Sequence, residues 1–273
     1  VLVPGLCVTV VQSYLAALHR SQVVLWVTLI AVAVNVAVNW ALIFGNWGFP
    51  EMGARGAAVA TLVVQVVSLV FLALYAGLLP DLRRFHLFQR FWRPDWHAMG
   101  QVWRLGVPIG LTGLAEGGLF QASALMMGWI GTVQLAAHGI ALEVAALAFM
   151  LHVGLSSSAT IRIARFDGEG NRVALRQAAK VSVAISFGVA LFSVALFLAF
   201  GRPIVALFLD MSKPESAEIL DYGVVLLGLA ALFQLADGMQ VMALGLLRGV
   251  KDTKVPLGLA AVSYWLIGIP CSY

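Results

Sequence analysis

The chain has 273 residues, of which 61% are hydrophobic and only 11% are charged, and its formal net charge is +4. A soluble domain carries roughly 25% charged residues, so this composition excludes that class and indicates a polytopic membrane protein. The two cysteines, Cys7 and Cys271, lie in apolar runs at opposite ends of the chain. This placement predicts buried free thiols and argues against a disulfide or a metal site.

Apolar runs long enough to cross a bilayer recur along the chain. Crossing a hydrocarbon core of ~30 Å takes about 20 residues as a helix, and the alternation expected of a membrane strand is missing. We therefore predict an all-α helical bundle with eight spans, at residues 1–18, 23–44, 54–79, 105–130, 134–161, 181–200, 219–247 and 255–273. The first and last runs look truncated, so we expect a fragment of a longer protein that lacks both ends.

The basic residues predict the orientation of these spans. Of the 17 Lys and Arg, 14 fall in alternate loops, at residues 19–20, 80–104, 162–180 and 248–254. The positive-inside rule makes these loops cytoplasmic in a multi-pass membrane protein. In the longest loop, 80–104, five Arg are interleaved with aromatic residues. Beside a membrane span this pattern favours an interfacial segment against anionic lipids over a nucleic-acid site, and the loop is also our candidate linker.

Three carboxylates lie deep inside predicted spans. A charged residue at the bilayer centre costs about 2.5 to 3.5 kcal/mol on insertion scales. Glu116 and Asp237 both lie about 15 Å from the cytoplasmic ends of their helices, at a rise of 1.5 Å per residue, so they can share one depth. We expect this pair to bind H⁺ or Na⁺. The alternative is a protonated acid that hydrogen-bonds to nearby backbone, and for Glu143, which is also central, the two readings stay open.

Four amides inside the predicted spans are candidates for accessory residues of a cavity. Gln234 and Gln240 flank Asp237 at three residues on each side, and Asn35 and Asn39 share one face of an amino-terminal span. Such amides contribute either to helix–helix packing or to a cavity.

Glycines recur on one face of the Glu116 helix and predict the close approach of a neighbouring helix; they are Gly106, Gly110, Gly113 and Gly117. His138 and His152 have no metal-ligand spacing, so we expect core or cavity roles. The Ser156–Ser158 run predicts packing and backbone hydrogen bonds. We expect no enzymatic activity, no cofactor and no metal beyond a coupling Na⁺.

Three stretches of the sequence resemble the multidrug and toxic compound extrusion (MATE) family, most closely its NorM-type branch. They read VNVAVNWALIFGNWGFPEMGARGAAVAT, PIGLTGLAEGGLF and FQLADGMQVMALGLLRGVKDT, and a fourth stretch, GTVQLAAHGIALEVAALAFMLHVGLSSSATIRIARFDGEGN, carries the same resemblance. The resemblance implies a fragment of a two-lobe, twelve-helix transporter. Residues 1–79 would end the amino-terminal lobe, 80–104 would link the lobes, and 105–273 would form most of the carboxy-terminal lobe.

The resemblance also implies a function. Family members are secondary antiporters of the inner (plasma) membrane that export cationic, often aromatic, drugs in exchange for H⁺ or Na⁺. We expect a monomer at full length, with organic cations and membrane lipids as partners. It places Glu116 and Asp237 on acids tied to cation binding. Phe233 departs from a common Tyr and Glu143 from a common amide. A lipid-linked oligosaccharide flippase and a membrane-embedded enzyme are the alternatives.

Overall fold

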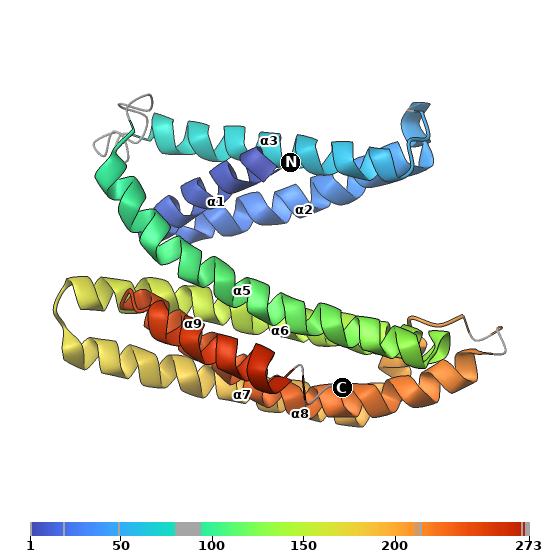
Figure 1. The fold of residues 1–273 in the computed structure, drawn as a ribbon. Helices are drawn as coiled ribbons and strands as arrows, with labels where there is room; N and C mark the ends of the chain where they lie inside the picture. Colours follow the sequence, from blue (N-terminus) through green and yellow to red (C-terminus); the bar gives the residue numbers. More distant parts are fainter. Residues whose placement is uncertain are drawn as a thin grey trace. The chain divides into compact units, whose positions relative to one another are not determined.

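The protein is described by a computed structural model at residues 2–18, 20–48, 50–79, 94–210, 212, 215–268 and 270. Within these ranges the regular secondary structure is helical, with no strand, which confirms the predicted all-α class. The chain divides into two compact units, residues 1–94 and 95–273 (Figure 1).

Figure 1 labels the main helices, which are numbered in chain order. They are α1 (Leu2–Ala17), α2 (Ser21–Phe44), a 3-10 turn (Asn46–Gly48), α3 (Ala54–Leu78), α5 (Trp96–Ile130), α6 (Thr132–Gly168), α7 (Arg172–Ala206), α8 (Ser216–Gly249), α9 (Lys254–Ala260) and the π-helical η2 (Ala261–Gly268).

Among the described residues, five helices are long and apolar enough to cross a membrane, namely α2, α3, α6, α7 and α8. They coincide with five of the eight predicted spans. α1 and the continuous α9–η2 segment are shorter apolar helices. α5 has 35 residues and is long enough to cross a membrane. Its glycines and Glu116 lower its mean hydropathy, so it is not one of the five.

In the first unit, α3 packs against both α1 and α2. Its core is aliphatic, formed by Val8, Val11, Leu15, Val27, Leu72 and Ala76. Cys7 is a free thiol, but it is exposed, so its predicted burial is wrong. The cause is the rotation of α1, which turns the neighbouring Val8 and Val11 toward the core.

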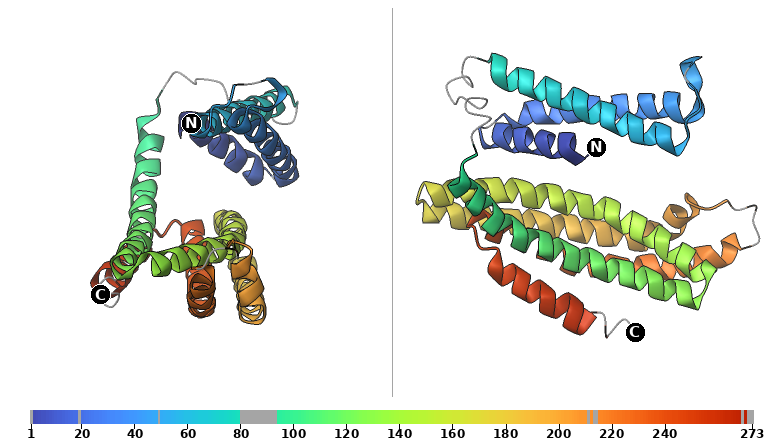
Figure 2. Two further views of the ribbon diagram at one scale, coloured as in Figure 1. Left: turned by 90° about the vertical axis from the view of Figure 1, so that its right-hand side faces the viewer. Right: turned by 45° about the horizontal axis from the view of Figure 1, so that its top comes forward.

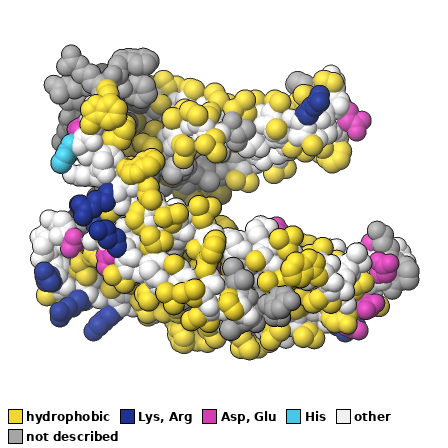
Figure 3. Space-filling view, viewed as in Figure 1, with side chains coloured by type: hydrophobic (Ala, Val, Ile, Leu, Met, Phe, Trp, Pro, Cys, Tyr) yellow, Lys and Arg dark blue, Asp and Glu magenta, His cyan; other side chains and the backbone are white. Residues whose placement is uncertain are grey.

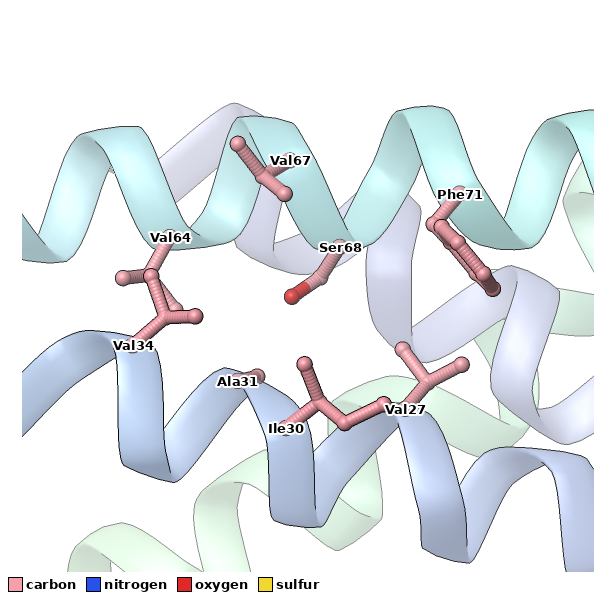
Figure 4. Close-up of a pocket in the computed structure, with 8 residues that line it drawn as sticks. All are labelled: Val27, Ile30, Ala31, Val34, Val64, Val67, Ser68 and Phe71. Atoms are coloured by element: carbon pink, nitrogen blue, oxygen red, sulfur yellow. The ribbon is translucent and has the colours of Figure 1, made fainter.

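A small cavity of about 50 Å³ lies between α2 and α3 (Figure 4). Ser68 contributes a single hydroxyl to an otherwise aliphatic and aromatic lining. This cavity is far smaller than the roughly 300 to 1,000 Å³ of typical ligand sites, and we assign it no ligand.

In the second unit, α8 packs along both α6 and α7, while α5 packs on α6 and on the α9–η2 segment (Figures 1 and 2). An aliphatic and aromatic core joins α6, α7 and α8; its buried members are Val144, Phe197, Val205, Leu220, Leu227 and Ala231. These helices fix the positions of the site residues described below.

α5 begins before its predicted start at residue 105. The Asp95 side chain accepts hydrogen bonds of 3.0 Å from the backbone N–H groups of His97 and Ala98, and such an N-cap satisfies donors that a helix start leaves unpaired. Residues 96–104 of the predicted linker are therefore helical. Residues 80–93, the rest of that linker, lie outside the described residues.

Charged side chains of the second unit gather at the ends of its helices (Figure 3). In this view Lys and Arg cluster at one end, where a few Asp and Glu also lie, whereas the charged side chains at the other end are mostly Asp and Glu. Hydrophobic side chains cover much of the surface between the two ends. An apolar band between two charged ends is the surface expected of a helix bundle in a bilayer.

Candidate functional site

α8, the helix that carries Asp237, packs tightly against α6. We call this contact the α6–α8 seam. The Ser156 hydroxyl donates to the Val241 carbonyl oxygen at 2.7 Å, and the Thr160 hydroxyl donates to the Gly245 carbonyl oxygen at 2.8 Å. These bonds confirm the expected backbone bonding of Ser156. Interhelical hydroxyl bonds and small residues are the usual devices that let membrane helices pack closely.

Three carboxylates meet in one cavity of the second unit. Glu116 comes from α5, Glu143 from α6 and Asp237 from α8. The cavity has a volume of about 460 Å³, within the range of small-molecule sites. Much of its wall consists of small residues, which are Gly113, Gly117, Ala145, Ala146 and Ala230.

The carboxylates differ in burial. Asp237 is only 7% exposed, Glu116 is half-buried, and Glu143 is exposed. Across the described residues, none of the three forms a hydrogen bond or an ion pair. Carboxylate oxygens that have no such partner among the described residues are suited to a proton or a hard cation such as Na⁺.

Aromatic rings line the same cavity. Phe120 and Phe233 meet edge to face, with ring centroids 6.0 Å apart, and Phe149 also lines the wall. Phe149 was not among the predicted site residues, because its spacing of six residues puts it about 120° around the helix from Glu143. Aromatic faces beside carboxylates attract organic cations. Phe233 contributes no oxygen, in contrast to the Tyr that the resemblance leads one to expect.

The predicted amides separate into three environments. Gln234 is 1% exposed and lines the cavity, and its Nε2 has no hydrogen-bond partner among the described residues. Gln240 is not among the residues that line the cavity, and its Nε2 donates to the Tyr264 hydroxyl on η2, which is the helix–helix alternative. Asn35 and Asn39 belong to the first unit, where Asn39 Nδ2 donates to Asn35 Oδ1 at 2.8 Å.

The glycine face of α5 has a different role from the predicted one. A Cβ atom added at Gly106, Gly110, Gly113 or Gly117 would meet no described atom within 4 Å, so no helix approaches closely there. Gly113 and Gly117 instead line the cavity beside Glu116. The missing side chains thus leave space at the carboxylates.

The two histidines occupy the environments expected of them. His152 is fully buried, and its Nδ1 lies 3.0 Å from the Ser186 hydroxyl oxygen. His138 lines a second cavity of about 300 Å³, which shares Phe120 and Phe233 with the carboxylate cavity. The phenylalanine pair therefore lies at the boundary of two neighbouring cavities.

Curated sequences similar to this chain are multidrug resistance proteins by name. The probable multidrug resistance protein NorM of Rhizobium meliloti is 44% identical over 270 residues, which cover 99% of this chain and 58% of that protein. The protein of the same name from Agrobacterium fabrum is 44% identical over 272 residues, which cover all of this chain and 58% of its own length. The chain thus spans less than two thirds of the length of these relatives.

Solved structures share the fold. The crystal structure of the eukaryotic MATE transporter AtDTX14 matches with a TM-score of 0.84 and 20% identity, over 95% of this chain and 56% of that one. A Vibrio cholerae MATE transporter matches with a TM-score of 0.81 and 18% identity, over 98% of this chain and 58% of that one. The family model MatE matches residues 108–273. Since that match covers more than half of the chain, the chain belongs to the MatE family.

Proposed function

We propose that this chain forms part of a secondary antiporter that exports organic cations in exchange for H⁺ or Na⁺. The convergence of Glu116, Glu143 and Asp237 on one cavity carries the proposal. The names of the relatives and the MATE fold of the structural neighbours support it. Residues 1–94 and 95–273 correspond in this proposal to parts of two lobes.

The proposed mechanism is competition between two cations for one set of carboxylates. Glu116 and Asp237 bind the coupling ion, and Glu143 and Gln234 contribute to the same cavity. Binding of the ion neutralises carboxylate charge, which weakens the attraction for a cationic drug. When the drug binds, it displaces the ion in turn, so exchange requires no covalent step and no cofactor.

The test is a transport assay with the protein expressed at full length and reconstituted in liposomes loaded with ethidium. An imposed H⁺ or Na⁺ gradient should accelerate ethidium movement above the rate without a gradient, and the active gradient identifies the coupling ion. If neither gradient changes the rate in vesicles whose protein is correctly folded, the antiport proposal is wrong.

A flippase for lipid-linked oligosaccharides is less well supported. A pyrophosphate substrate requires cationic side chains, with Arg preferred for phosphate recognition, and the residues that line the carboxylate cavity include no Lys or Arg. The negative charge of this cavity would repel such a substrate. A membrane-embedded enzyme has no observation in its favour among the described residues.

A further inference from the structure

A second charged groove lies at the opposite end of α5 from the α5–α6 turn, away from the carboxylate cavity. It has a volume of about 620 Å³ and is formed by the first turns of α5 together with the turn between α8 and α9. Arg104, Lys251 and Lys254 line it, and all three are exposed. The groove therefore combines cations from two segments that are far apart in the sequence.

The groove has an uncompensated positive charge. Asp252 is the acidic residue in its lining, and one oxygen of that carboxylate accepts a hydrogen bond from the Val255 N–H at 3.3 Å. Neither ion pair recorded among the described residues involves a cation of the groove. Three cations against one carboxylate leave a surplus that attracts an anion.

The turn holds Lys251 in a backbone conformation that side chains rarely adopt. Its φ angle is 62°, in the left-handed region that favours glycine. Hydrogen bonds fix the turn, because Lys251 N–H donates to the Arg248 carbonyl oxygen at 3.0 Å and Asp252 N–H donates to the Leu247 carbonyl oxygen at 2.9 Å. A charged lysine therefore occupies a backbone position at which glycine would be less strained.

The apolar parts of the lining indicate what kind of anion fits. Leu105 and Val250 lie in the same groove, where α5 and α8 pass from their charged ends into their apolar lengths. A ligand in this groove meets both cationic and apolar side chains. This is the chemistry of a phospholipid, and basic pockets at the cytoplasmic ends of membrane helices are known to suit anionic headgroups.

We propose that Arg104, Lys251 and Lys254 bind the headgroup phosphate of an anionic phospholipid in this groove. The proposal does not depend on the transport mechanism, since none of these residues lines the carboxylate cavity. It also gives the groove a role at the membrane surface, where headgroup phosphates are abundant.

The test measures bound lipid on the full-length protein in a neutral detergent, by native mass spectrometry during titration with phosphatidylglycerol or phosphatidylcholine. We expect saturable binding of phosphatidylglycerol and a preference over phosphatidylcholine. Lys251→Gly should weaken phosphatidylglycerol binding about fivefold while its thermal unfolding midpoint stays equal or rises, because the substitution removes a charge and relieves the backbone. Lys254→Gln should weaken binding to a similar extent.

The matched control is Arg176→Gln, which removes one exposed cation on α7 outside the groove. Its affinity for phosphatidylglycerol should stay within about twofold of the parent protein. Equal losses in Arg176→Gln and Lys251→Gly would mean that overall charge decides binding, and unchanged affinity in both groove variants would mean that the groove binds no lipid. Inorganic phosphate at millimolar concentration should not displace the lipid; displacement would assign the groove to free phosphate. Each of these three results overturns the proposal.

Discussion

Gly245→Ala is expected to destabilise the protein by about 1 to 3 kcal/mol, the usual cost of adding a methyl group to a packed interior. An added Cβ would lie 2.7 Å from the Ser156 carbonyl oxygen, which belongs to the backbone of α6 and cannot rotate away. α6 and α8 must therefore separate, and separation lengthens the hydrogen bond from Thr160 to Gly245. Asp237 is carried on the same helix, so its position shifts as well.

Thermal unfolding of the purified full-length protein in detergent measures this effect. Gly228→Ala on the same helix is the matched control, since its Cβ would meet Leu198 at an ordinary 3.9 Å, and alanine favours a helix over glycine by up to about 1 kcal/mol. The midpoint should fall in Gly245→Ala and hold or rise in Gly228→Ala. Equal midpoints for both variants would show that the α6–α8 seam tolerates expansion.

Glu116→Gln and Asp237→Asn are each expected to reduce gradient-driven ethidium efflux to the rate without a gradient. Both substitutions keep the shape of the side chain and remove the negative charge that is proposed to bind the two competing cations. Neither carboxylate has a hydrogen-bond partner among the described residues, so neither substitution breaks a described hydrogen bond. Since a buried charge is costly, thermal stability should be maintained or increased.

The efflux assay in liposomes, at equal amounts of folded protein, measures this prediction. Glu218→Gln removes an exposed carboxylate in the first turn of α8 and should transport as the parent does. Glu143→Gln tests the third carboxylate of the cavity: a loss of efflux adds Glu143 to the ion site, and normal efflux limits the site to the pair. Undiminished efflux in both Glu116→Gln and Asp237→Asn would contradict the proposed ion site.

Depth inside the membrane was predictable from the sequence because a helix converts residue number into distance along its axis. Glu116 and Asp237 were paired because their predicted depths are equal, and both line one cavity in the structure. Rotation about the helix axis was not predictable. Gln234 and Gln240 each lie about 60° from Asp237 around the helix, on opposite sides, and the packing of α8 directs one to the cavity and the other to Tyr264.

The surroundings of the glycine face of α5 were also not predictable from the sequence. Glycine at every third or fourth residue predicts a close helix contact, but the identical spacing arises when a helix borders an open space. The sequence contains no signal that separates these cases, because the difference lies in what the rest of the chain places opposite. In this structure the neighbouring side of Gly113 and Gly117 is the carboxylate cavity.

The wall of small residues around the carboxylates has a consequence for how such a transporter diversifies. A glycine or alanine that borders open space can grow by one or two carbon atoms without disturbing either the helix seams or the acids. In the proposed transporter, the bulk of the accepted drug and the charge that drives exchange are therefore governed by separate residues. In that transporter, substitutions at positions such as Gly113 and Gly117, where an added Cβ meets no described atom within 4 Å, would change which drugs fit while the carboxylates stay in place.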